Sequence, residues 1–120
     1  MAVAEIAERI VIFLSEDDHC GRQKLYEAII DHAREDGIAG ATVWRGIEGY
    51  GASKRIHTAG FSEGSRGLPV AIEVLDAPDR VDAFLPVVRR IAPYALVIRQ
   101  EVRVAHFPST PASSLDDLDQ

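Results

Sequence analysis

The sequence predicts an α+β domain with the ferredoxin-like order βαββαβ, in which two helices cover one face of an antiparallel sheet. Short apolar runs typical of strands alternate with two segments of helical periodicity. Turns rich in glycine and proline separate these runs. The composition, with 47% hydrophobic and 27% charged residues in 120, is that of one ordinary globular domain. We expect that domain over 9–107, with an N-terminal extension at 1–8 and a disordered acidic tail at 108–120.

The first half of the chain predicts a strand, a helix and a second strand. An apolar run without alternation over 9–14 suits a strand that is covered on both faces. A helix is expected over 21–36, because apolar residues recur there at helical spacing and Gly37 can cap its end. The strand at 41–47 then enters a glycine-rich segment from Gly46, which would let it bulge or bend.

The second half predicts a strand, a helix and a final strand. The strand at 68–75 is followed by Asp76, which stands where a helix would begin. That helix ends before Pro93, and Pro86 is expected to bend or divide it.

The final strand is expected over 96–107, with apolar side chains on one face and charged side chains on the other. Arg99 and Arg103 are expected to form salt bridges with Glu101 and Glu73. An intersubunit cleft is the alternative location for these two arginines.

Charge and hydropathy exclude several classes of protein. A formal net charge of -6 argues against binding to nucleic acid or to an anionic membrane. No apolar run is long enough to span a bilayer, and Glu5 and Glu8 stand where a signal peptide needs basic residues, so we expect a cytoplasmic protein. The single Cys20 has no partner for an internal disulfide.

One face of the predicted sheet has no helix to cover it. The first strand is apolar on both sides and is central in this topology, so its second face needs another subunit. A small domain of this size also gains stability from an interface. We therefore expect a closed oligomer.

Two glycine-rich motifs suggest a family. Residues 37–43 read Gly-Ile-Ala-Gly-Ala-Thr-Val, and 45–51 read Arg-Gly-Ile-Glu-Gly-Tyr-Gly. Together with the segments 25–28, 33–35, 56–58 and 68–70, they resemble the PII signalling superfamily. The resemblance is closest to its uncharacterised PII-like member, domain of unknown function 190, and covers about 9–107.

The resemblance implies a homotrimer with ligand clefts between subunits and a flexible loop, 50–67, that reports the ligand state to a partner. That partner would be a membrane transporter or channel. The PII phosphate-binding loop between the second helix and the last strand is replaced here by Ala-Pro-Tyr-Ala at 92–95. ATP binding of the PII kind is therefore not expected, because such loops generally need glycine, whereas a nucleotide with fewer phosphates stays open.

The candidate ligand site combines the glycine motif with a locally basic loop, which favours a small anionic metabolite such as an adenine nucleotide. Thr42, Gly49 and Gly51 match the superfamily's nucleotide-contact motif, although a bulged strand end would explain the glycines equally simply. In the loop, Lys54, Arg55 and His57 could clamp a phosphate or carboxylate. Alternatively, they could form a solvated loop tip that touches a target protein. The full set is Thr42, Gly49, Tyr50, Gly51, Lys54, Arg55, His57 and Arg103.

The sequence offers no pattern of catalytic residues with recognisable context, so we expect a protein that is not an enzyme and has no cofactor. The run Asp-Asp-His-Cys at 17–20 lacks the usual spacing of metal ligands. The leading hypothesis is a small-molecule-sensing regulator, with a ligand-independent interaction module as the alternative. A metal-binding trimer is the remote alternative.

Overall fold

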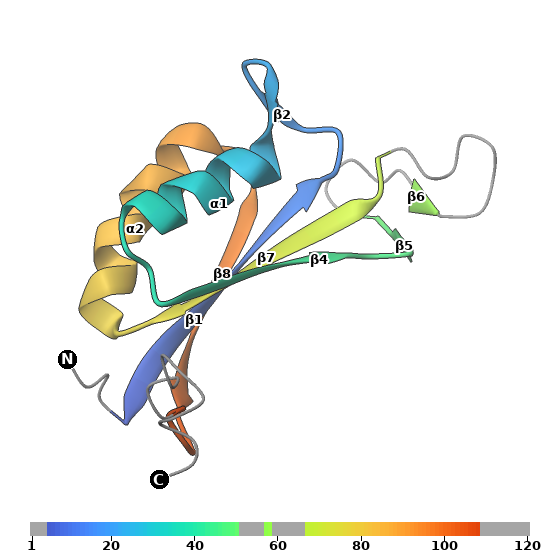
Figure 1. The fold of residues 1–120 in the computed structure, drawn as a ribbon. Helices are drawn as coiled ribbons and strands as arrows, with labels where there is room; N and C mark the ends of the chain where they lie inside the picture. Colours follow the sequence, from blue (N-terminus) through green and yellow to red (C-terminus); the bar gives the residue numbers. More distant parts are fainter. Residues whose placement is uncertain (1–4, 51–56, 59–66, 109–120) are drawn as a thin grey trace, which may run out of the picture.

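The computed structural model describes residues 5–50, 57–58 and 67–108. These form one four-stranded sheet, two helices and two small hairpins (Figure 1). The sheet strands are β1 (Ile6–Ser15), β4 (Gly40–Arg45), β7 (Pro69–Asp76) and β8 (Leu96–Arg103). The helices are α1 (Leu25–Glu35) and α2 (Pro78–Ile91), and the hairpins pair β2 (His19–Cys20) with β3 (Gln23–Lys24) and β5 (Glu48–Gly49) with β6 (His57–Thr58).

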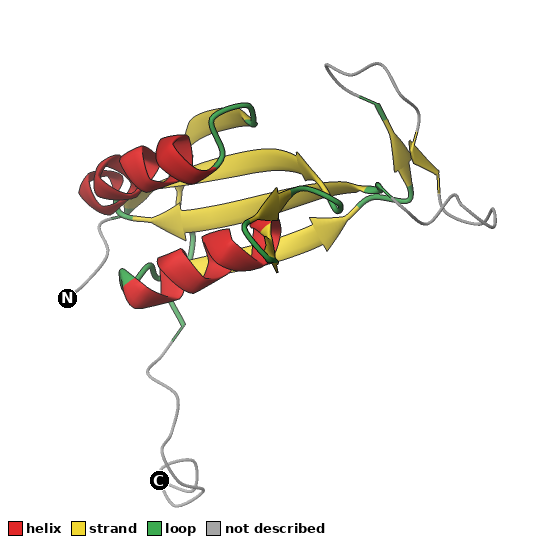
Figure 2. Cartoon of the chain, turned by 90° about the horizontal axis from the view of Figure 1, so that it is seen from above, coloured by secondary structure: helices red, strands yellow, loops and turns green. Residues whose placement is uncertain are grey.

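The strand order in the sheet is β4-β7-β1-β8, and every neighbouring pair is antiparallel. Both helices lie on the same face of this sheet (Figures 1 and 2). The ferredoxin-like α+β fold predicted from the sequence is therefore confirmed, including the central place of β1 between β7 and β8.

The core lies between the sheet and the two helices. Ile10 and Ile12 of β1 and Ile72 of β7 are fully buried there, and Ile29 of α1 and Phe84 of α2 pack onto them. These side chains come from alternate strand positions and from one stripe of each helix, as one-sided burial requires. This core holds the helix layer on the sheet and thereby fixes the position of the helices relative to the edge strands β4 and β8.

The other face of the sheet has no helix over it among the described residues (Figure 1). The strand register places Trp44, Phe13, Leu96 and Ile98 on this face, and all four side chains are exposed. We call this surface the uncovered face. Arg9, which pairs with Glu73 and donates to Gln100, forms a polar cluster on the same face.

Helix α1 begins later than the sequence predicts. The positive φ of 64° at Gly21 turns the chain into the β2–β3 hairpin, so the helix starts at Leu25. Its end is as predicted: Gly37 has φ 72°, and the backbone N–H of Ile38 donates to the carbonyl of Ala33, which completes a glycine-based C-terminal cap.

Four other features of the elements differ from expectation. Strand β1 runs from Ile6 to Ser15, so it is longer than the expected 9–14 and includes part of the expected N-terminal extension at 1–8. Helix α2 continues through Pro86, so a division of the helix there is wrong. Pro86 and Asp82, whose carbonyl loses its helical donor, are both exposed, which allows water to replace that donor. The last strand ends at Arg103 rather than at residue 107. The strand expected from 41 begins one residue earlier and ends at Arg45.

The charged pairs also differ from those expected. Arg99 pairs with Glu8 of β1 and Asp82 of α2, whereas Glu73 pairs with Arg9 on the opposite face of the sheet. The predicted partners were wrong because Glu101 was chosen along β8 and Glu73 lies on the other face of the sheet, while the register brings β1 beside β8. The pairing therefore follows from strand order, which is a tertiary property.

Asp76 joins three segments at the end of β7. Its side chain is only 4% exposed, and it accepts hydrogen bonds from the backbone N–H of Ala39 at 2.9 Å and of Ala77 at 2.7 Å. The N-cap of α2 is thus Ala77, one residue beyond the position that the sequence suggested for a capping side chain. Arg80, which lies 3.7 Å from the Asp76 carboxylate, donates to the carbonyls of Asp36 and Gly37 at the end of α1.

Replacing Asp76 with Ala should lower the free energy of unfolding by about 1–3 kcal/mol, because the amide of the buried Ala77 and the amide of Ala39 lose their acceptor. Urea denaturation followed by circular dichroism measures this loss. Asp79→Ala, at an exposed position on the same helix turn, is the matched control and should change stability much less. Equal losses in the two variants would contradict the role given to Asp76.

Candidate functional site

Four chain segments meet at one end of the sheet, which we call the loop end. Here β1 and β4 finish while β7 and β8 begin, since Phe13 lies opposite Leu96 and Val70 lies opposite both Leu14 and Arg45. The small β5–β6 hairpin extends beyond it (Figures 1 and 2). The glycine motif singled out in the sequence therefore lies at a junction of strands rather than within one strand.

Pro69 explains two of the glycines in this motif. A Cβ atom on Gly46 would lie 2.7 Å from Pro69 Cγ, and one on Gly49 would lie 3.2 Å from the same atom. The Gly46 amide also donates to the Pro69 carbonyl at 2.7 Å. Both glycines thus let the chain pass closely over the first residue of β7, which sets the direction in which β5 leaves the sheet.

An ion pair braces the same junction. Arg45 Nη2 lies 2.6 Å from Glu16 Oε1, and the Glu16 backbone N–H donates to the Leu68 carbonyl at 2.8 Å. The Glu16 side chain is mostly buried, whereas that of Arg45 is 58% exposed. The Arg45 guanidinium is therefore held in place by Glu16 beside the turn that starts at Gly46.

The described site residues lie at separate places. Thr42 is exposed on β4, opposite Glu73, on the uncovered face. Gly49 is in β5, paired with His57 of β6, and Tyr50 next to it is exposed. The side chain of His57 and the whole of Gly51, Lys54 and Arg55 lie outside the described residues.

Arg103 lies at the opposite edge of the sheet from Thr42. It is the last residue of β8, opposite Ile6, whereas Thr42 belongs to the other edge strand. Within one chain the fold therefore does not bring Thr42 and Arg103 together.

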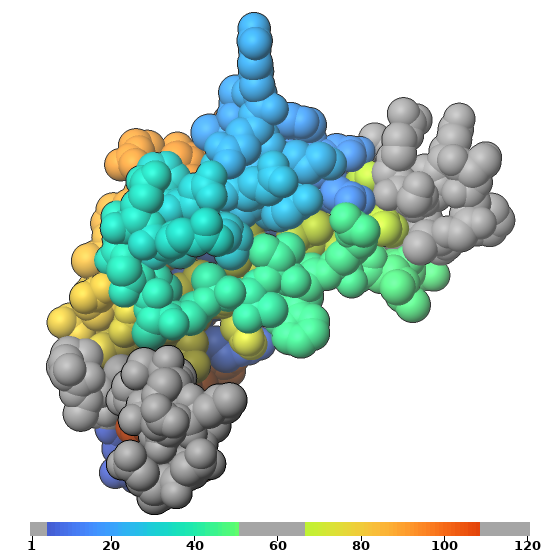
Figure 3. Space-filling model, in the orientation of Figure 1, coloured from blue at the N-terminus to red at the C-terminus, as the bar shows by residue number. Residues whose placement is uncertain are grey.

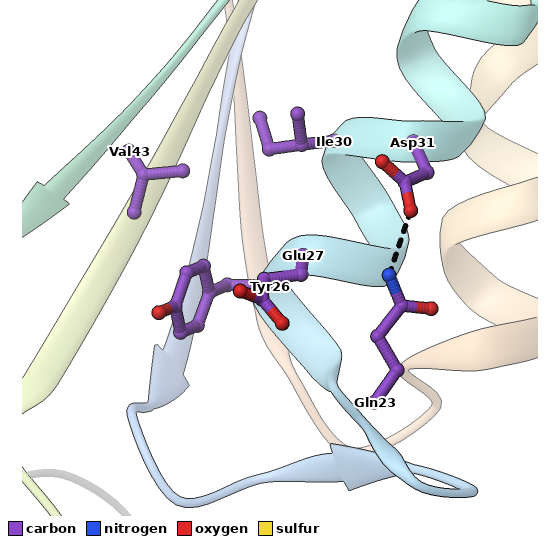
Figure 4. Close-up of a pocket in the computed structure, with 6 residues that line it drawn as sticks. All are labelled: Gln23, Tyr26, Glu27, Ile30, Asp31 and Val43. Carbon is purple, nitrogen blue, oxygen red and sulfur yellow. Dashed lines mark hydrogen bonds between the residues drawn. The ribbon is translucent and has the colours of Figure 1, made fainter.

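A groove between α1 and β4 was missed in the sequence. Tyr26, Ile30 and Val43 point into it, while Glu27 and Asp31 lie along its rim with Gln23, which donates to Asp31 at 2.6 Å (Figure 4). Figure 3 shows α1 and β4 side by side on this open surface. Tyr26 and Ile30 could have been noted as apolar residues outside the main helical stripe, but only the fold shows that they adjoin an edge strand.

The side chains with shifted pKa values, Glu8 and Arg99, belong to a cluster with Asp82 where β8 lies beside β1. The hydrogen bond from the Arg99 guanidinium lowers the pKa of Glu8 below its usual value. The same hydrogen bond, with one to Asp82, raises the pKa of Arg99. Both shifts stabilise charges that hold α2 over β8, so they reflect structure rather than catalysis.

The described residues contain no group of three or more histidine, cysteine or acidic side chains placed to hold a metal ion. Cys20 is exposed in the β2–β3 hairpin. No helix among these residues is long and apolar enough to cross a membrane.

Gly46→Ala should destabilise the protein by about 1–3 kcal/mol, because the added methyl group overlaps the Pro69 ring. Thermal or urea unfolding measures the loss. Gly40→Ala is the matched control, since a Cβ there would lie 3.9 Å from its nearest neighbour, the Leu75 carbonyl oxygen. If Pro69→Ala does not restore stability to Gly46→Ala, the overlap with Pro69 is not the cause.

A family model matches most of the described fold. The family described as DUF190, Uncharacterized ACR, COG1993, matches residues 7–104. The chain belongs to this family. A relative from Aquifex aeolicus (strain VF5), a UPF0166 protein, is 36% identical over 74 residues, which cover 62% of this chain and 70% of the relative. The resemblance proposed from the glycine motifs is thus confirmed.

Solved structures share the fold at low sequence identity. The chain is similar to CPII, a nitrogen regulatory PII-like protein from Thiomonas intermedia K12, in its structure bound to ADP and bicarbonate, with a TM-score of 0.64 and 14% identity over 88% of this chain and 95% of CPII. It is also similar to the divalent ion tolerance protein CutA1 from Ehrlichia chaffeensis, with a TM-score of 0.57 and 16% identity over 88% of this chain and 87% of CutA1. Similarity at this identity establishes the ferredoxin-like fold of PII-like proteins.

Proposed function

We propose that this DUF190 chain is an oligomeric PII-like regulator that binds a small anionic effector, such as an adenine nucleotide, beside β4 at the loop end. Effector binding would then change how the segment 50–67 fits a partner protein, which would be a transporter or channel. Thr42 and the glycine motif would contact the effector, and Lys54, Arg55 and His57 would neutralise its charge.

The observation that carries this proposal is the similarity to CPII, whose structure is bound to ADP and bicarbonate. Two features of this chain agree with it. The edge strand β4 ends at a glycine turn held against Pro69, and the exposed Tyr50 follows that turn directly. The guanidinium of Arg45 is held beside the same turn by Glu16 and has a side chain that is 58% exposed, so it can donate hydrogen bonds to an anion.

The uncovered face supports a homotrimer. Leu96 is 63% exposed and Trp44 is 60% exposed, and a contiguous apolar surface of this kind on a small domain indicates a protein interface. Copies related by a closed rotation would bury this face and leave the helices outside. Because Thr42 and Arg103 lie at opposite sheet edges, Arg103 can reach a β4 site only from another copy.

Isothermal titration calorimetry with ADP, AMP and bicarbonate tests the ligand. We expect saturable binding of ADP or AMP, and Thr42→Val should weaken it about tenfold, which corresponds to about one hydrogen bond. Thr42→Ser keeps the hydroxyl and is the matched control. Absence of binding across a wider panel of anionic metabolites would contradict the sensor and favour a ligand-independent interaction module, for which exposed Ile47 and Tyr50 would form the contact surface.

Leu96→Glu should dissociate the oligomer, because it places a charge on the uncovered face. Size-exclusion chromatography with multi-angle light scattering should give a trimer mass for the wild type and a monomer mass for the variant. Ala83→Glu adds the same charge at an exposed position of α2 and should leave the mass unchanged. A monomeric wild type at all concentrations would contradict the assembly.

A further inference from the structure

Helix α1 presents a charged and apolar pattern beyond the β4 edge. Ile30 lies in the groove beside Val43, and Glu27 lies at the rim of that groove. Arg34 is seven residues after Glu27, so it lies on nearly the same side of the helix, about two turns further on. This side, which we call the α1 flank, therefore has acidic Glu27 at one end and basic Arg34 at the other, with Ile30 and the rim residue Asp31 between them.

Helix α2 presents the matching pattern beyond the β8 edge. Arg80 reaches the end of α1, so its side of α2 faces α1, while Asp82 reaches Arg99 of β8 and faces the other way. Arg89 is seven residues after Asp82 and shares its side of the helix, with exposed Pro86 between them. This side, the α2 flank, therefore also has an acidic residue at one end and a basic residue at the other, with Pro86 between them.

The two flanks run in opposite directions along the molecule. Helix α1 returns from the end of β1 and α2 returns from the end of β7, and these strands are antiparallel. Glu27 and Arg89 therefore both lie toward the loop end, whereas Arg34 and Asp82 both lie toward the other end. If the flanks of two copies face each other, Glu27 of one copy meets Arg89 of the other, and Arg34 meets Asp82.

The charges on the flanks are largely unused within one copy. In the part of the chain that the structure describes, Glu27, Arg34 and Arg89 are exposed and form no ion pair. Asp82 has a side chain that is 62% exposed, so it can accept a second donor beside Arg99. Tyr26, Ile30 and Val43 provide an apolar floor to the groove between these charges.

We propose that the groove between α1 and β4 receives the α2 flank of a second copy, with Arg89 of that copy opposite Glu27 and its Asp82 opposite Arg34. Pro86 of the second copy would cover Ile30. The contact is head-to-tail, because each copy offers an α1 flank on one side and an α2 flank on the other, so a rotation that closes produces a ring. This inference rests on the proposed oligomer and names the surfaces that set its register.

Charge reversal tests the pairing at the loop end. Glu27→Arg or Arg89→Glu should each raise the concentration at which the oligomer half-dissociates by about tenfold or more, because each places like charges opposite one another. The double variant Glu27→Arg/Arg89→Glu restores opposite charges and should return this concentration to near that of the wild type. Sedimentation velocity over a dilution series measures it, and circular dichroism checks that each variant is folded.

Arg90→Glu is the matched control for Arg89→Glu, since it makes the same change in charge one residue further along and points about 100° away around the helix. It should leave dissociation unchanged. If an oligomer forms but the single variants behave like Arg90→Glu, or the double variant is weaker than both singles, the flank contact is wrong while the oligomer stands. If the wild type is monomeric, the proposed assembly fails with it.

Discussion

The fold depends on the two-sided pairing of β1. This strand is hydrogen-bonded to β7 on one side and to β8 on the other, so its side chains can point only toward the helices or toward the uncovered face. Ile10 and Ile12 take the first direction and are fully buried, while Phe13 takes the second and remains 44% exposed. One strand thus builds the core and also supplies an apolar surface that no helix among the described residues covers.

The helix layer is tied to this sheet by polar groups at the start of α2 and on its outer side. Asp76 and Arg80 join the start of α2 to the turn between α1 and β4, and they satisfy backbone groups that the helix ends leave without partners. Arg99 holds the outer side of α2 over β8 through Glu8 and Asp82. These contacts fix which side of each helix faces outward, and so they decide which charges are presented to another copy.

The loop end shows how a motif can have two explanations at once. The glycines of the segment 45–51 attracted notice as a ligand-contact motif, yet Gly46 and Gly49 also have a packing role against Pro69. The two roles are compatible, because a turn that must pass close to one side chain also leaves its backbone accessible on the other side. The braced Arg45 adds charge to a turn whose path is already set by packing.

Residue patterns by themselves determined the order of strands and helices, the central position of β1, the glycine cap at Gly37 and the family. These are local or alternating properties, and burial on one face leaves a direct trace in the spacing of apolar residues. The start of α1 was misplaced because the turn at Gly21 interrupts a segment whose apolar spacing is helical. Helix α2 continues through Pro86 because that turn of the helix is exposed to solvent, and the sequence does not state this exposure.

Only the tertiary structure decided the charged partners, the packing of the glycines and the separation of Thr42 from Arg103. Arg99 finds Glu8 and Asp82 because strand order brings β1 and α2 beside β8, and no spacing within β8 could indicate this. Likewise, the groove beside Val43 and the two complementary flanks exist because an edge strand and a helix meet at the margin of the sheet. Contacts between residues distant in the chain are set by how the elements pack, which is why the sequence determined the fold of this protein but its surfaces emerged only in three dimensions.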